Sequence, residues 1–215
     1  MGLFALHAAN EVGACMRNAV WMLVLLALAA CEAKKKPMDS ERKAVAVPRS
    51  QVSAQYVAQQ IVGALGRKDY ATVSRNASAG GVRISPHAKV DKRSDVVLSA
   101  QELSACATDP KIRVWGTTDG KGDAMSFTCA GYFAKYVYSA DFASITPTDG
   151  MVKGHVAPGE TDLAATYSNA KIYEYYIAPA AGKPEQSWAI LRIVLMQEGH
   201  SGYKIVGLSS DRWRI

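Results

Sequence analysis

The segment WAILRIVLMQ, residues 188–197, decides the fold that we expect for this chain. It is an apolar run rich in branched residues, and its length suits a β-strand. Residues 199–202 (GHSG) supply turn-forming glycines, and the run Tyr203–Leu208 again has the composition of a strand. The two runs therefore predict a β-hairpin in the last part of the chain.

One charged residue interrupts this strand. Arg192 lies between Leu191 and Ile193, and burying an unpaired guanidinium costs several kcal/mol. We therefore expect Arg192 either to pair with an acidic side chain or to bind an acidic group of a ligand. The acids considered for the pairing, which we favour over the ligand, are Asp141, Glu174 and Asp211.

Helices are expected before these strands. Apolar residues at helical spacing and capping signals predict helices over 53–66, 70–76, 99–106 and 129–137. Short runs of branched and aromatic residues predict further strands over 82–86, 96–98, 111–116, 170–178 and 212–215. Helices first and antiparallel strands last predict an α+β fold with helices packed on one face of a curved, mainly antiparallel sheet.

Composition divides the chain into unequal parts. Residues 51–215 are numerous enough for one domain with a sizeable core. Residues 31–50 carry six basic and three acidic residues, half of the formal net charge of +6, and have no apolar period. We expect them to form a flexible tether that reaches roughly 25 Å. The remaining charge is scattered without interleaved aromatic residues, which indicates no nucleic-acid partner.

The N-terminal segment has the proportions of a secretory signal. Ala19–Ala30 is an uncharged apolar run after Arg17, and it is short for a bilayer span. Leu28–Cys31 (LAAC) resembles the lipobox of bacterial lipoproteins. The resemblance implies that residues 1–30 are a signal peptide, with Met16 as its more natural start, and that Cys31 is acylated.

The same resemblance predicts where the protein resides. Acyl chains on Cys31 would anchor it to a membrane of the bacterial cell envelope. In enteric-type bacteria an aspartate after the cysteine signals inner-membrane retention, and this chain has Glu32 there. We therefore expect an outer-membrane anchor facing the periplasm if the cell is Gram-negative.

Three longer segments resemble a bacterial family of secreted or lipid-anchored proteins. They are Gly81–Asp91 (GVRISPHAKVD), Trp115–Phe142 and Trp188–Ile215, and the family shares GVRFSP, WGxxDGxG and C-terminal WxI motifs. The helix-then-sheet plan is similar to the NTF2-like (cystatin-like) fold, a cone whose sheet often encloses a pocket. The resemblance thus implies a cone over residues 51–215.

Two cysteines remain in the exported part. Because an even pair in an oxidising compartment favours a disulfide, we expect Cys106 to be bonded to Cys129, with two buried thiols as the alternative.

Several aromatic residues are candidates for lining a ligand pocket together with Arg192. They are Trp115, Tyr136, Tyr175 and Trp188, and the alternative is that they simply fill the core.

A carboxylate close to tyrosines resembles the arrangement of pocket isomerases on similar folds. Asp141 and Tyr138 are therefore the candidate catalytic base and acid, although such chemistry needs a carboxyl group tuned by an apolar site.

We expect no metal and no cofactor. His87, His155 and His200 lack metal-ligand spacing, and the glycines of residues 116–122 match neither a dinucleotide fingerprint nor a P-loop. The favoured hypothesis is a non-catalytic envelope lipoprotein that binds a small ligand, a cell-wall component or an envelope protein. The alternatives are a small isomerase- or dehydratase-like pocket enzyme and a structural or assembly factor of the envelope.

Overall fold

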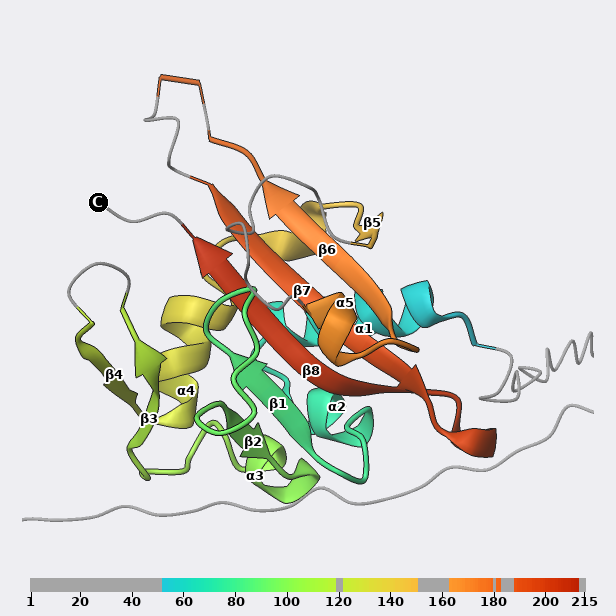
Figure 1. Ribbon diagram of the computed structural model, residues 1–215, viewed down its shortest axis with the longest axis horizontal. Helices are drawn as coiled ribbons and strands as arrows, with labels where there is room; N and C mark the ends of the chain where they lie inside the picture. The colour runs from blue at the N-terminus through green and yellow to red at the C-terminus, as the bar shows by residue number, and fades with distance from the viewer. Residues whose placement is uncertain (1–51, 119–121, 151–162, 180, 183–187, 213–215) are drawn as a thin grey trace, which may run out of the picture. The chain divides into compact units, whose positions relative to one another are not determined.

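Six strands form the main sheet of the computed structural model, in the order β2-β1-β8-β7-β6-β5 (Figure 1). The structure describes residues 52–118, 122–150, 163–179, 181–182 and 188–212. The predicted signal peptide, the tether, Cys31 and His155 lie outside these residues. The strands of the main sheet are β1 (Val82–Ser85), β2 (Val96–Leu98), β5 (Thr148–Asp149), β6 (Lys171–Ile177), β7 (Ala189–Gln197) and β8 (Tyr203–Arg212).

The predicted hairpin is the centre of this sheet. β7 pairs antiparallel with β8 on one side and with β6 on the other. β1 pairs parallel with β8, so the sheet is mixed although most of its pairs are antiparallel. The predicted α+β class is therefore confirmed. The prediction that a separate strand begins at residue 212 was wrong, because β8 continues without interruption from Tyr203 to Arg212.

The helices follow the capping signals. Ser53 Oγ accepts a hydrogen bond from Tyr56 N at the start of α1, and Ser99 with Glu102 forms a reciprocal capping box at α3. The α-helices are α1 (Ala54–Gly66), α2 (Tyr70–Arg75), α3 (Ala100–Ser104), α4 (Cys129–Tyr132) and α5 (Leu163–Thr166), with short 3₁₀ turns at Phe142–Ser144 and Gly199–Ser201. No helix in the described part of the chain is long and apolar enough to cross a membrane.

The helix expected over 129–137 changes type in its middle. After α4 the backbone continues as a π-helical turn, Phe133–Val137, closed by a 2.8 Å hydrogen bond from Tyr138 N to Phe133 O. The apolar spacing predicted a helix but carries no signal for this wider turn.

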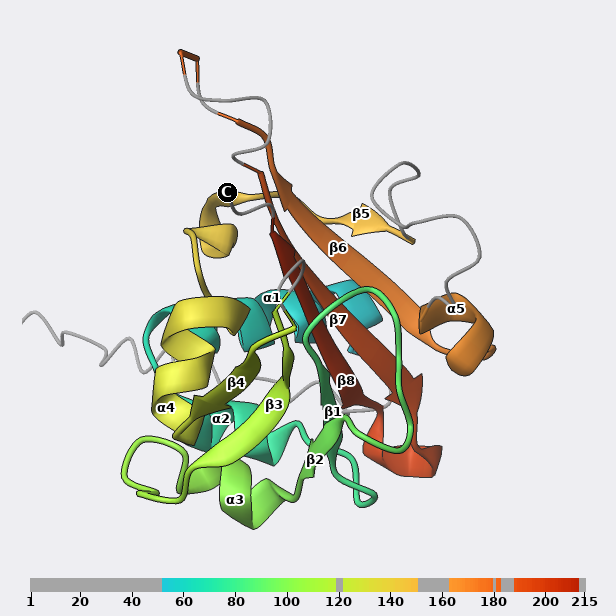
Figure 2. The same cartoon turned by 60° about the vertical axis from the view of Figure 1, so that its left-hand side comes forward.

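Helices cover the two faces of the main sheet unequally. Figure 2 shows α1, α2 and α4 on one side of the sheet, and α5 with the loop after β1 on the other. We call these the helix face and the loop face. The helix face holds the large core, whereas the loop face has a small cluster formed by Val90, Leu163, Ile172 and Val194. The prediction that helices pack on one face only was wrong, because α5 lies on the loop face. This helix is a single turn, and no helix was predicted in the last third of the chain.

A two-stranded ribbon extends beside the main sheet. β3 (Arg113–Thr117) pairs antiparallel with β4 (Ala124–Phe127), a strand that the sequence did not predict. Trp115 of β3 is fully buried, and its indole Nε1 donates to Phe127 O at 3.0 Å.

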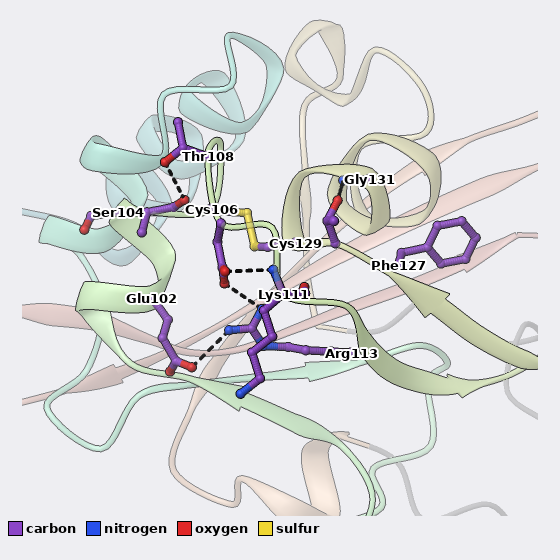
Figure 3. Close-up of a disulfide and its surroundings, with 12 residues drawn as sticks. Glu102, Ser104, Cys106, Thr108, Lys111, Arg113, Phe127, Cys129 and Gly131 are labelled. Carbon is purple, nitrogen blue, oxygen red and sulfur yellow. Dashed lines mark hydrogen bonds and ion pairs between the residues drawn. A yellow bond between two sulfur atoms is a disulfide. The ribbon is translucent and has the colours of Figure 1, made fainter.

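A disulfide joins the end of one helical segment to the start of another. Cys106, just after α3, is bonded to Cys129 at the start of α4, and their Cα atoms are 5.1 Å apart (Figure 3). Both cysteines are buried. Arg113 lies nearby and pairs with Asp109 at 2.7 Å and with Glu102 at 3.2 Å. The predicted disulfide is therefore confirmed.

Reducing this bond, or replacing both cysteines by alanine, should lower the free energy of unfolding by roughly 3 kcal/mol, because an open loop of this length has more entropy when unfolded. Urea denaturation with and without reductant measures the change. Two free thiols titrated before reduction, or identical unfolding curves, would contradict the bridge.

Candidate functional site

A fully buried ion pair lies at the centre of the main sheet. Arg192 of β7 is directly opposite Glu174 of β6, and its Nε donates to Glu174 Oε2 at 2.7 Å. Both side chains have 0% exposure. Glu174 is thus the partner among the three acids considered for Arg192.

Polar residues extend this pair across two further strands. Arg192 is opposite Ser209 of β8, which in turn is opposite Ser85 of β1. Because directly opposite residues share a face, Glu174, Arg192, Ser209 and Ser85 form a polar row on the loop face. The Ser209 hydroxyl donates to His87 O at 2.8 Å, which ties the loop after β1 to the sheet.

The row ends at a half-buried carboxyl group. Ser85 Oγ donates to Asp95 Oδ2 at 2.6 Å, and the Asp91 backbone N–H donates to the same oxygen at 3.1 Å. Burial raises the pKa of Asp95, although these hydrogen bonds act in the opposite direction. Asp95 therefore ties the end of the loop after β1 to the last residue of that strand and to the middle of the loop.

Of the nitrogen atoms of the Arg192 guanidinium, only Nε has a hydrogen-bond acceptor among the described residues. The Nη1 and Nη2 atoms are buried and meet no hydrogen-bond acceptor among the described residues. A buried cation with a single acid partner gains little from the pair, but either group left alone in the interior is very costly. The ion pair therefore acts chiefly as a constraint on strand register, and the role of Arg192 in a ligand pocket stays a prediction.

The candidate catalytic residues do lie together. Tyr138 Oη donates to Asp141 Oδ1 at 3.0 Å and accepts from Ala143 N at 3.1 Å. Burial raises the pKa of Tyr138, so the phenol remains a protonated donor at neutral pH. Asp141 is exposed to solvent rather than enclosed by apolar groups.

This pair borders two depressions in the surface of the helical layer. One, of about 560 Å³, is lined by Gly63, Arg67 and Asp141, among others. The other, of about 220 Å³, is lined by Lys68, Tyr70 and Phe133. Tyr138 and Gly66 line both depressions.

Tyr138 can lie so close to α1 only because residue 66 is glycine. A Cβ atom at Gly66 would be 2.7 Å from Tyr138 Oη and 2.9 Å from its Cζ. The depressions thus depend on a missing side chain at the last position of the helix.

Three of the four aromatic residues predicted to line one pocket, Trp115, Tyr136 and Tyr175, belong to the core of the helix face. Trp115 and Tyr136 belong to one column, because each stacks on Tyr132, with ring centroids 4.3 Å and 5.1 Å apart. Arg212 continues the column, with its guanidinium carbon 5.0 Å from the centroid of Tyr136.

The other two aromatic candidates come from the β6–β7 part of the main sheet. Tyr175 follows Glu174 on β6, so it points to the helix face, opposite to Arg192. Trp188 immediately precedes β7 and is half-buried. Tyr132 and Arg212, which complete the column, were not recognised from the sequence. The i, i+4 spacing of Tyr132 and Tyr136 was the available signal.

Among the residues that the structure describes, no three His, Cys, Asp or Glu side chains are grouped so that they could hold a metal ion. Comparison with known proteins adds nothing to the geometry. No family model matches the chain, and neither a curated protein nor a solved structure matches it.

Replacing Arg192 by methionine should cost about 3–5 kcal/mol of folding free energy, because Glu174 is left buried without its partner. The double variant Arg192→Met, Glu174→Leu should recover most of this loss. Urea denaturation of the two variants and the parent measures the difference. A single variant as stable as the parent, or a double variant no better than the single one, would show that the pair does not act as described.

Proposed function

We propose that this protein is a lipid-anchored component of the bacterial cell envelope whose α+β domain binds a ligand or a partner without catalysing a reaction. Cys31 carries the acyl chains, residues 31–50 form the tether, and residues 51–215 form the binding domain. In a Gram-negative cell the domain faces the periplasm from the outer membrane. The observation that carries the binding role is the pair of depressions that share Tyr138 and Gly66 in their lining.

Two features support the location. The LAAC segment ending at Cys31 has the lipobox pattern, and basic tether residues follow it. The disulfide between Cys106 and Cys129 suits an oxidising compartment outside the cytoplasm. The proposed acyl chains and the disulfide therefore both support a location in the cell envelope, outside the cytoplasm.

We further propose that the domain is a variant of the NTF2-like cone. In support, α1 and α2 precede the strands and pack on the helix face, and the long strands β6, β7 and β8 are antiparallel neighbours. The loop face of this sheet carries the polar row.

The geometry around Tyr138 supports binding more than catalysis. A general base at neutral pH needs a raised pKa, which an apolar enclosure provides. Asp141 is instead exposed, and the phenol that it contacts also receives a backbone hydrogen bond from Ala143. Arg67, Lys68 and the Tyr138 ring offer charge and an apolar surface to a bound molecule.

Metabolic labelling with palmitate tests the anchor. The native product should be labelled, and Cys31→Ser should abolish labelling and move the protein from the membrane fraction to the soluble or uncleaved pool. An unlabelled native product, or a Cys31→Ser variant with unchanged fractionation, would refute the proposed location.

Mass spectrometry of molecules that co-purify with the protein tests the binding site. Gly66→Ala should displace Tyr138 and abolish co-purification, while unfolding should change by less than about 1 kcal/mol because alanine favours the helix. Gly80→Ala is the matched control, since a Cβ there meets only Ser78 Oγ at 3.8 Å. Equal retention of the bound molecule by both variants would exclude these depressions as the site.

A further inference from the structure

A separate groove lies between the first two helices and the β7–β8 hairpin. It has a volume of about 230 Å³, and ten residues from these segments line it. Its lining includes Val52, Tyr56, Arg75, Tyr203 and Lys204. It shares no lining residue with the depressions beside Tyr138.

Two cations are held at this groove by contacts that fix their positions. Lys204 Nζ donates to Arg75 O at 2.7 Å, and Arg75 Nη2 donates to Thr72 Oγ1 at 2.6 Å. Neither contact neutralises a charge. No acidic residue is among the described residues lining the groove. Asp69 accepts from Thr72 N and Oγ1 at the start of α2 and interacts electrostatically with Arg75 without a direct hydrogen bond among those described.

Aromatic side chains lie beside the cations. Tyr56 has 53% of its surface exposed, which is unusual for so large a side chain, and Tyr203 is half-buried. A tyrosine ring next to arginine and lysine is the combination found where proteins meet the headgroup region of a bilayer, because the ring is apolar and its hydroxyl is wet. The groove is therefore complementary to phosphate groups above an apolar layer.

The proposed anchor would place this groove near a membrane. Val52, the first described residue, is part of its lining. With the anchor proposed above, residues 32–51 separate Val52 from the acylated Cys31, and a linker of about that length would reach roughly 25 Å. The proposed anchor would thus keep the end of the domain that carries the groove close to the lipid surface.

We propose that this groove is a membrane-docking site that takes the phosphate of an anionic lipid headgroup, with Arg75 and Lys204 binding the phosphate and Tyr56 entering the interface. The proposal rests on the lipid anchor proposed above. Docking would hold the domain in one orientation on the membrane and leave the Tyr138 depressions for a different ligand.

Vesicle co-sedimentation tests the site without the anchor. The mature chain from residue 31, with Cys31→Ser, is mixed with vesicles of phosphatidylcholine alone or of equimolar phosphatidylcholine and phosphatidylglycerol. The chain should bind the anionic vesicles more tightly. Arg75→Gln with Lys204→Gln should weaken that binding at least fivefold, since one basic residue near an anionic surface contributes about a fivefold factor. Lys92→Gln with Lys111→Gln, both exposed residues outside the groove, removes the same charge and should weaken binding less than about twofold.

Tyr56→Ser provides a second readout that keeps both charges. It should also weaken binding to the anionic vesicles, and because Tyr56 is exposed it should leave the unfolding curve unchanged. Equal weakening by the two charge pairs, or no effect of Tyr56→Ser, would overturn the proposal. So would groove-dependent binding of a soluble acidic glycan or peptide with no preference for anionic vesicles. Since this chain bears no acyl group, the result is independent of the palmitate experiment.

Discussion

The hydrogen-bonded pair of Arg192 and Glu174 limits how the central strands can be assembled. Both side chains are fully buried, so any pairing that separated them would leave two uncompensated charges in the interior. A slip of β7 by one residue would also turn its alternate side chains to the wrong face. With this register in place, β8 presents Leu208 to the helices and Ser209 to the loop face, where the polar row continues to β1.

The parts of the fold that could be predicted were those with local signals. Ser53, Asp69 and the Ser99–Glu102 box marked helix starts that the structure contains, and the glycines of residues 199–202 marked the hairpin. The parallel pairing of β1 with β8 joins segments far apart in the chain, and no local pattern indicates it. β4 is four residues long and borders a glycine loop, so its signal was too short to separate from the loop.

The candidate sites also divide into those with a local sequence signal and those that depend on distant segments. Tyr138 and Asp141 are three residues apart, so their contact could be expected from the sequence. The aromatic residues and Arg192 come from several elements, and strand alternation sends Arg192 and Tyr175 to opposite faces. The groove beside Val52 combines two helices with a distant hairpin, which only the folded chain brings together. Binding surfaces of this kind depend on tertiary structure, whereas the anchor and the disulfide depend on single residues.

The constraint on strand register can be measured at the Arg192 Nε–H itself. Hydrogen exchange followed by NMR should show this proton exchanging as slowly as the backbone amides of β7, because it is buried and donates to Glu174 Oε2 at 2.7 Å. Glu174→Gln should accelerate that exchange together with the amides of β6 and β7. Exchange of this proton at the rate of an exposed arginine in the native protein would contradict a buried pair at the centre of the sheet.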